Sequence, residues 1–428
     1  MKKELHLMII WKNALSKKEE ILKDLENNFK IRNKYYINWS KKNYSKNLSR
    51  FYGTALPDGC DKETHCGRGK FLLLILEDEN PKYEERLTSH GNEVVNVNMF
   101  DKKTEYRKLT GGGHKIHATN NEDETNHDLT LLLGKNIDDF IKSVKPSNKI
   151  VDLDQDLFGA KGWTSVKEMF YALNNCLKYV VLRDFENDMD ELNFAPNYDA
   201  DLLCDDGKNA QWVLNADLEI IDNKKQYSAI LNDKKCLFDI KYLSDDYYCE
   251  KLEKDILNTR IYHNGYYIPN KEYHYMSCLI HALIHKFNFE DEYNERLGML
   301  FKKHDSNKTK DEFIRKASDW MKKHNYQITI PKDNYNNFNV ENVCEFDKSL
   351  FKYCMEDYKN TKLNVSNYEQ IKEEMNKYND LEKEIKNLKE ELNILTNKYN
   401  ALNTEHNMIV NSKSWRLISK IRKIIKRK

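Results

Sequence analysis

The chain has 428 residues, which is enough for two or three domains with hydrophobic cores of their own. It carries 70 basic and 69 acidic residues, so the whole sequence lacks the positive excess typical of a nucleic-acid-binding protein. Nine cysteines occur singly, which argues against a disulfide framework or a zinc ribbon and favours a reducing cytoplasm. Since no run of about 18 apolar residues occurs, we expect neither secretion nor a membrane span.

Residues 1–145 are predicted to form an α+β domain. Short apolar stretches ("LHLMII", "KFLLLILED", "VVNVNMF") alternate with stretches of helical pattern ("SKKEEILKDLENN", "EDETNHDLTLLLG"). In "TGGGHKIHATNN" a glycine turn is followed by a short strand, a histidine and the start of a helix. Gly112 and Gly113 would let the backbone approach a phosphate, and a helix start offers unpaired N–H groups. This segment is therefore a candidate phosphate-binding turn.

The same segment resembles the active-site motif of nucleoside diphosphate kinases, N-x-[IV]-H-[GA]-[ST]-[DN]. The resemblance implies a ferredoxin-like fold for residues 5–135 and makes His117 the histidine that is phosphorylated. It also implies that Tyr52 stacks on a base and that Arg107 binds phosphate. A repurposed nucleotide- or phosphosugar-binding domain is an alternative, and a loop merely lined by His114 and His117 is another.

The stretch "YGTALPDGCDKETHCGRGKF" is an addition that the nucleoside diphosphate kinases do not have. It contains Arg68 and Lys70, which we include among the candidate nucleotide-binding residues.

Residues 150–300 are predicted to form a second α+β domain, whose most informative stretch is "APNYDADLLCDD". In a strand, Asp199 and Asp201 would project to the same side, with Cα atoms about 7 Å apart. The apolar strand "CLFDIKYL" carries Asp239, which would be costly to bury without a cation. Three acids on adjacent strands suit two-metal phosphoryl or nucleotidyl chemistry with Mg²⁺ or Mn²⁺. The alternative is a solvated acidic turn.

The run "YVVLRDFE … YDADLLCDD … CLFDIKYLSDD … YHYMSCLIHALIHK" resembles a nucleotidyltransferase-superfamily domain of bacterial capsule and O-antigen gene clusters, over about residues 160–290. Such domains show an L-R-x-F-E strand, a D-x-D-L-L strand, an F-D-I-R-like strand and a Y-H-A-L-x-x-K helix. The resemblance implies that Asp199, Asp201 and Asp239 are the metal-binding carboxylates and that Arg183 contacts phosphate. A mixed sheet is the fold it implies.

Basic and histidine side chains accompany these acids. Lys241 stands where arginine is commoner in the resembling domains, and we include it among the phosphate-binding candidates. On the following helix His274, Cys278, His281 and His285 share one face, which predicts a packed helix facing the cleft more than a metal site.

The C-terminal third divides into three segments. Residues 301–367 are polar and predict a helical or irregular connector. Residues 368–410 predict a coiled coil, because apolar residues keep an alternation of three and four steps: Tyr378, Leu381, Ile385, Leu388, Leu392, Leu395, Tyr399 and Leu402. These eight residues form a narrow apolar seam, which needs a partner helix to bury it. A parallel homodimer is a simpler explanation than a partner helix within the same chain.

Residues 411–428 contain eight basic residues and no acidic one, so the rest of the chain carries a net charge of about −7. Trp415, Ile418, Ile421 and Ile425 fall on one helical face, with basic residues around the rest, as in helices that lie on anionic membranes. A solubilising end and a nucleic-acid-binding end are alternatives. After a coiled coil, the tail resembles the ends of many bacterial polysaccharide glycosyltransferases and methyltransferases.

These features predict a Mg²⁺-dependent transferase that moves a nucleotidyl, sugar-phosphate or glycosyl group in cell-surface polysaccharide biosynthesis. The expected partners are a nucleotide or activated phosphosugar, a glycan or lipid-linked acceptor and the anionic inner face of the membrane, without specific nucleic acid. The expected location is cytoplasmic and peripheral to that membrane. A phosphotransferase that uses His117 and a non-catalytic, phosphosugar-binding scaffold are the alternatives.

Overall fold

The computed structural model describes residues 3–361 apart from 89–90, 184, 186–198, 222–223, 287–288, 290–308 and 334. Beyond residue 361 it describes single helical residues between Glu384 and His406, and Trp415. The chain divides into two compact units, Met1–Thr361 and Lys362–Lys428, which are described separately below.

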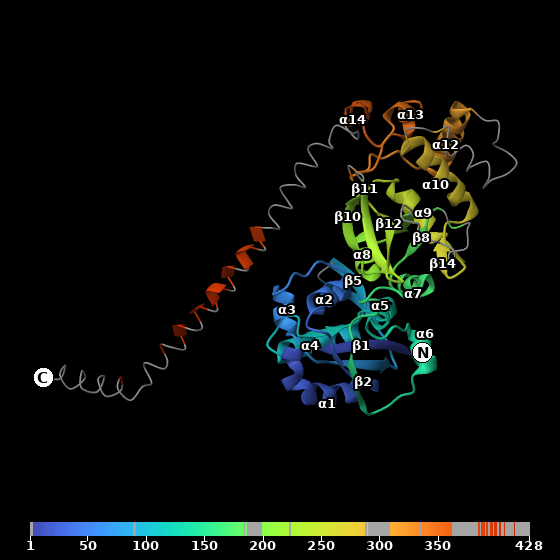
Figure 1. Cartoon of the computed structure of the whole chain (residues 1–428). Helices are drawn as coiled ribbons and strands as arrows, with labels where there is room; N and C mark the ends of the chain where they lie inside the picture. The colour runs from blue at the N-terminus through green and yellow to red at the C-terminus, as the bar shows by residue number, and fades with distance from the viewer. Residues whose placement is uncertain are drawn as a thin grey trace. The chain divides into compact units, whose positions relative to one another are not determined.

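The N-terminal part of the first unit is built on a five-stranded sheet (Figure 1). Its strand order is β6-β1-β3-β2-β7, and all neighbours are antiparallel except β2 and β7. The strands are β1 Glu4–Ile10, β2 Lys30–Asn38, β3 Phe71–Asp78, β6 Ile116–Ala118 and β7 Ile150–Asp154. The order places β6 and β7 at opposite edges.

Helices cover both faces of this first sheet. Alternate residues of the apolar strands β1 and β3 therefore enter two different hydrophobic cores, one on each face. Leu7 and Ile9 pack beneath three helices, whereas Met8 and Ile10 pack beneath two others. The first group is α2 Tyr44–Tyr52, α5 Glu122–Leu133 and α6 Ile137–Ser143, and the second is α1 Lys18–Asn28 and α4 Val97–Leu109. The apolar runs in the sequence are thus fully buried strands.

A second five-stranded sheet has the order β10-β11-β12-β9-β8. Only β12 and β9 run parallel, and the other neighbours are antiparallel. The strands are β8 Tyr179–Val181, β9 Asp199–Cys204, β10 Asp217–Ile221, β11 Lys224–Leu231 and β12 Lys234–Tyr242. The helices α7 Val166–Cys176 and α8 Gly207–Leu214 contribute to the core on one face. The predicted α+β class is therefore confirmed, with two mixed five-stranded sheets.

The remaining elements are short or lie at the periphery. They are η1 Lys12–Lys17, α3 Asp61–Cys66, β4 Tyr83–Thr88, β5 Gly91–Asn96, α9 Glu250–Asn258, β13 Ile261–His263, β14 Tyr266–Ile268, α10 Lys271–Ile284, α12 Lys310–His324, α13 Val340–Cys344, η3 Lys348–Leu350 and α14 Met355–Asn360. The expected apolar strand "VVNVNMF" is only half a strand. It ends at Asn96, whose side chain accepts a hydrogen bond from the backbone N–H of Met99 and so begins α4.

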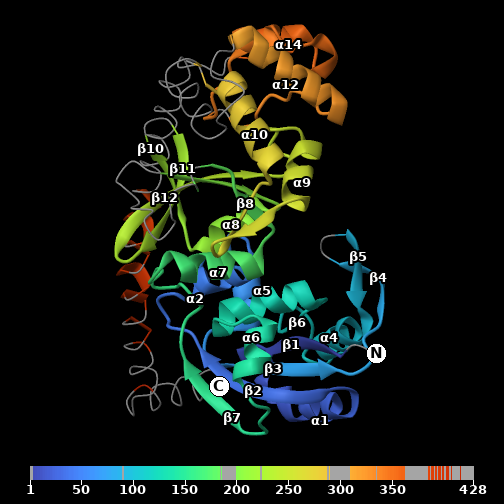
Figure 2. The same ribbon diagram turned by 90° about the vertical axis from the view of Figure 1, so that its right-hand side faces the viewer.

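The helices α2, α5, α7 and α8 lie between the two sheets (Figure 2). Arg50 of α2 is fully buried there. Its guanidinium donates to the carbonyl oxygens of Trp212 (2.9 Å), Val213 (3.2 Å) and Phe158 (2.7 Å). The two sheets therefore share one compact unit, and the predicted boundary near residues 145–150 stays a prediction.

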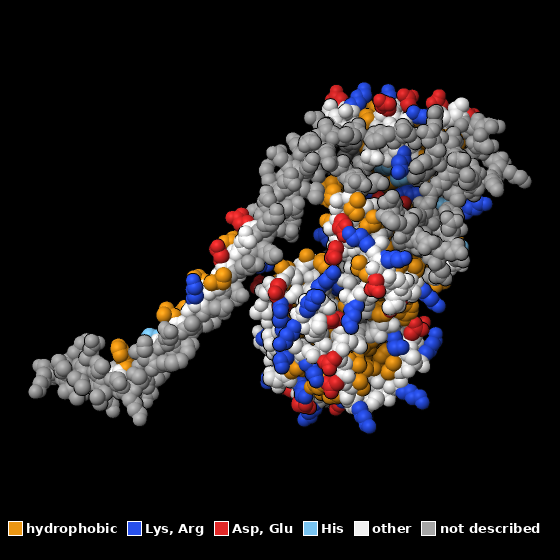
Figure 3. All heavy atoms as spheres, in the orientation of Figure 1, with side chains coloured by type: hydrophobic (Ala, Val, Ile, Leu, Met, Phe, Trp, Pro, Cys, Tyr) orange, Lys and Arg blue, Asp and Glu red, His pale blue; other side chains and the backbone are white. Residues whose placement is uncertain are grey.

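In the second unit, the described residues between Glu384 and His406 are helical. The six described members of the predicted seam are exposed by half or more (Figure 3): Ile385 50%, Leu388 56%, Leu392 64%, Leu395 65%, Tyr399 65% and Leu402 66%. Tyr378, Leu381 and the tail except Trp415 lie outside the described residues, and the coiled coil stays a prediction.

In the described part of the chain, no helix combines the length and the apolar character needed to cross a membrane.

Candidate functional site

Asp199, Asp201 and Asp239 lie on one face of the second sheet. The parallel strands β9 and β12 pair directly, with Asp239 opposite Asp201. Because side chains alternate along a strand, Leu202 and Phe238 enter the core, and the three aspartates point to the other face. The structure therefore brings the carboxylates onto adjacent strands, as the sequence predicts, and their role as metal ligands stays a prediction.

Arg183 follows β8 and forms a bidentate ion pair with Asp201. Its Nε lies 2.9 Å from Asp201 Oδ2 and its Nη2 lies 2.7 Å from Oδ1. Burial alone would raise the pKa of Asp201, but Arg183, with Lys241 and Lys286, holds it below its ordinary value. The third guanidinium nitrogen, Nη1, is buried and has no hydrogen-bond partner among the described residues. Arg183 therefore holds Asp201 in place through two of its nitrogens and leaves the third unpaired.

The other two aspartates have partners of their own. Lys241 Nζ lies 2.7 Å from Asp239 Oδ1 and 2.6 Å from Asn336 Oδ1. Gln226 donates to Asp199 Oδ2 at 2.8 Å. Burial and the nearby Asp201 raise the pKa of Asp239, although Lys241 opposes the shift. This face of the sheet therefore combines half-buried negative charge with two basic side chains.

The donor set fits Mg²⁺ chemically, since all three residues offer carboxylate oxygens. The spacing is looser than that of a closed site. Among the described residues, the aspartates do not form a group whose ligand atoms all lie within 4.8 Å of one another. Asp201 and Asp239 are ion-paired instead, so an ion would have to compete with Arg183 and Lys241 for them.

The histidines of α10 are packed side chains, as the sequence analysis favours. His274, His281 and His285 are each less than 9% exposed. Nδ1 of His281 is hydrogen-bonded to the hydroxyl of Tyr247, and His285 lies between the carbonyl oxygens of Asn337 and Tyr247. Burial, and then the charge of Arg183, lowers the pKa of His274 to about 4. Burial likewise lowers that of His285 to about 3 and that of His281 well below the ordinary value.

The lowered pKa values of these three histidines predict that the folded chain loses stability in mild acid. Their folded pKa values lie below those of the unfolded chain, near 6.5, so unfolding takes up protons as the pH falls from about 6.5 to about 4. We expect urea unfolding to show a falling free energy across this window. His274→Phe should give a shallower slope because one proton-uptake site is gone, and an unchanged slope would contradict the assignment.

The first sheet carries a second polar centre around His117 on β6. Its Nε2 lies 2.6 Å from Asp128 Oδ2, and the other oxygen of Asp128 lies 2.9 Å from His127 Nδ1. The rings of Phe51 and Tyr52 pack edge-on against the imidazole, with centroids 5.1 and 5.8 Å away. Burial would raise the pKa of Asp128, but the two histidines hold it below its ordinary value.

The sequence analysis did not single out Asp128 or its neighbour Glu124. The sequence does contain a pattern that indicates such a pair. Residues 124 and 128 are four apart in the helix that starts at Glu122, so both lie on one face of it. Only the tertiary contacts of His117 with Asp128 and Glu124 show that this face of the helix meets β6.

The predicted nucleotide-binding residues of the first domain are dispersed. Tyr52 lies beside His117, and Lys62 Nζ lies 3.7 Å from the ring centroid of Tyr52. Arg107 donates through Nε to the carbonyl oxygen of Ile116 at 2.9 Å, one residue before His117. Lys70 pairs with Asp152 on β7 at 2.6 Å, at the sheet edge opposite β6, so the structure does not bring it to His117.

Arg68 and the glycine turn lie on the loops around α3. Arg68 pairs with Glu63 at 2.6 Å and with Asp58. Gly112 and Gly113 have φ values of +82° and +76°, and a Cβ on Gly113 would lie 2.9 Å from the ring of His65. Glycine is therefore required at position 113 both by the left-handed backbone and by the close approach of this histidine.

No family model matches the sequence, and comparison with curated proteins and with solved structures gives no match either. The resemblances to nucleoside diphosphate kinases and nucleotidyltransferases therefore stay predictions.

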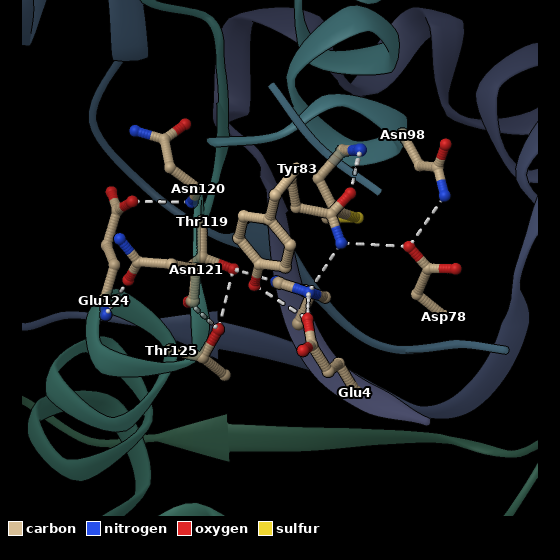
Figure 4. A network of polar contacts seen from close by, with 12 residues as sticks. Glu4, Asp78, Tyr83, Asn98, Thr119, Asn120, Asn121, Glu124 and Thr125 are labelled. Atoms are coloured by element: carbon tan, nitrogen blue, oxygen red, sulfur yellow. Dashed lines mark hydrogen bonds and ion pairs between the residues drawn. The ribbon is translucent and has the colours of Figure 1, made fainter. Parts of the chain in front are cut away.

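A buried hydrogen-bond network adjoins the His117 centre (Figure 4). His6, which is fully buried on β1, lies 3.3 Å from Thr119 Oγ1 and 3.1 Å from the amide nitrogen of Asn96. Asn96 in turn donates to Asp78 at 3.0 Å. Burial lowers the pKa of His6, although Glu4, 3.4 Å from its Nε2, opposes the shift. This network ties β1 and β6 to the start of α4 and has a structural role.

Proposed function

We propose that the chain is a Mg²⁺-dependent transferase that moves a nucleotidyl, sugar-phosphate or glycosyl group, with its chemistry at Asp199, Asp201 and Asp239. The observation that carries the proposal is the parallel pairing of β9 and β12, which sets Asp239 opposite Asp201 with Asp199 on the same face. When bound, Mg²⁺ would neutralise phosphate charge and polarise the reacting oxygens. The three carboxylates would hold it.

The neighbouring cations have separate roles in this proposal. Arg183 would keep Asp201 oriented through two contacts while its buried Nη1 binds a phosphate oxygen of the donor. Lys241 is anchored by Asn336 and would offer its charge to the same anion once Asp239 faces a metal ion. Both residues would thereby stabilise negative charge that develops on the transferred group.

The rest of the chain supports a role in assembling surface polysaccharides. The order β6-β1-β3-β2 is that of a ferredoxin-like sheet, which supports a nucleotide- or phosphosugar-binding role for the first part of the chain. The exposed apolar face of the C-terminal helix supports a homodimeric coiled coil. The basic tail would hold the enzyme at the cytoplasmic face of the membrane, where a lipid-linked or glycan acceptor is reached.

A screen of nucleotides and activated sugars for thermal stabilisation, with and without Mg²⁺, would first identify a donor. Transfer from that donor is then expected to depend on Mg²⁺ and to fall at least 100-fold in Asp199→Asn, because one metal ligand loses its charge. Asp217→Asn is the matched control, since Asp217 lies on the same sheet but is exposed. Full activity in folded Asp199→Asn would rule out the three-aspartate site.

A phosphotransferase that uses His117 is the second candidate. It is favoured by the contact of Nε2 with Asp128, which orients the ring and leaves Nδ1 without a hydrogen bond among the described residues. Incubation with γ-labelled ATP should then place acid-labile phosphate on the wild-type chain and none on His117→Ala. Absence of label on the wild type would remove this candidate.

A further inference from the structure

His117, Glu124 and Asp128 converge from two elements on one point. His117 lies on β6, and the two acids lie one turn apart on α5. One imidazole nitrogen and one oxygen of each carboxylate all lie within 4.8 Å of one another. Nε2 of His117 is 2.6 Å from Asp128 Oδ2 and 4.0 Å from Glu124 Oε1. Small side-chain rotations would bring all three to metal-bonding distance of a common centre.

Each carboxylate is anchored through the oxygen that faces away from His117. Oε2 of Glu124 accepts the backbone N–H of Asn120 at 2.6 Å, and Oδ1 of Asp128 lies 2.9 Å from His127 Nδ1. His127 extends this shell, because its Nε2 lies 3.4 Å from Asn209 on α8. Metal ligands are typically oriented by such outer contacts.

In the part of the chain that the structure describes, the ion-pair partners of these two acids are histidines. Lys103, the nearest candidate, donates to the carbonyl oxygen of Ala118 and to Asn120 Oδ1, and among the described residues no lysine or arginine forms an ion pair with Glu124 or Asp128. A divalent cation at this point would place positive charge directly between the two carboxylates.

We propose that His117 Nε2, Glu124 Oε1 and Asp128 Oδ2 bind one divalent first-row transition cation, at a site separate from the three aspartates. A mixed nitrogen and oxygen donor set suits Zn²⁺ or Mn²⁺ better than Mg²⁺. Three protein ligands leave a coordination position open for water or a substrate oxygen. The side chain of Glu124 is 30% exposed, against 10% for His117 and 3% for Asp128, so the ion would enter past Glu124.

The test is Zn²⁺ binding to the full-length chain after removal of metals with a chelator, measured by competition with a chromophoric zinc chelator. Wild type is expected to bind one Zn²⁺ tightly, and Glu124→Gln, which keeps the side-chain shape, to bind it at least tenfold more weakly. Co²⁺ added to the wild-type chain should give a visible absorption spectrum of a nitrogen- and oxygen-ligated ion, which needs no variant.

The double variant Asp199→Asn/Asp239→Asn is the control, because it removes the other carboxylate group and should leave Zn²⁺ binding unchanged. This control separates the inference from the proposed transferase, which depends on Mg²⁺ at those aspartates. Absence of Zn²⁺ binding by the wild type, or equal binding by Glu124→Gln, would overturn the inference. A loss of binding only in the double variant would assign the ion to the three aspartates instead.

Discussion

Arg50→Ala is expected to lower the free energy of unfolding by about 3 kcal/mol, because up to three buried carbonyl oxygens lose a charged donor and each costs roughly 1–3 kcal/mol when left unpaired. The guanidinium is fully buried and contacts Phe158, Trp212 and Val213. Burial lowers the pKa of Arg50 to about 10, so it remains charged at pH 7. Urea unfolding followed by circular dichroism measures the change.

The matched control for Arg50 is Lys46→Ala, one turn earlier on the same helix. Lys46 forms an ion pair with Asp217 in which both side chains are exposed, so its removal should leave the unfolding midpoint unchanged. Equal midpoints for Arg50→Ala and the wild type would show that the carbonyl contacts do not join the two halves of the unit.

Asp201→Ala is expected to destabilise the chain by about 3–5 kcal/mol, because it leaves Arg183 buried without its counter-charge. The Arg183 side chain is 3% exposed, and two of its nitrogens contact Asp201. Chemical unfolding should show a lower midpoint, whereas Asp199→Ala, which removes a hydrogen bond with Gln226, should change stability far less. Asp199 is therefore the better residue for testing activity.

A double variant separates the charge effect from lost packing. Arg183→Met in the Asp201→Ala background removes the orphaned charge and should recover part of the stability. If the double variant is less stable than Asp201→Ala alone, then Arg183 contributes mainly through packing and not through its pair with Asp201.

The sequence was most informative where a pattern is local. Alternation within "DADLL" and "LFDIKY" was enough to place Asp199 and Asp201 on one side of a strand and Asp239 among core residues. The partners of these acids could not be predicted in the same way. Gln226 and Asn336 reach the site from segments tens of residues away, and no periodicity marks them.

In the N-terminal half of the chain, the contacts of the charged residues were even harder to predict from the sequence. His117 and its glycine turn stand out in the sequence, whereas Lys70 and Arg68 carry no pattern beyond their charge and their place in the chain. In the fold Lys70 pairs with Asp152 at the far edge of the sheet, and Arg68 pairs with Glu63. Strand order, which depends on long-range pairing, decided which charged residues come near the histidine.

Local patterns were enough to predict the α+β class, the apolar strands β1 and β3 and the three acids of the second sheet, because burial and side-chain alternation depend on neighbouring residues. The ion pairs of Arg183 and Lys241 with two of those acids, and the approach of Glu124 and Asp128 to His117, become visible only in the fold. Those contacts join residues distant in the chain, and their energies exist only once the strands have paired and water has been excluded.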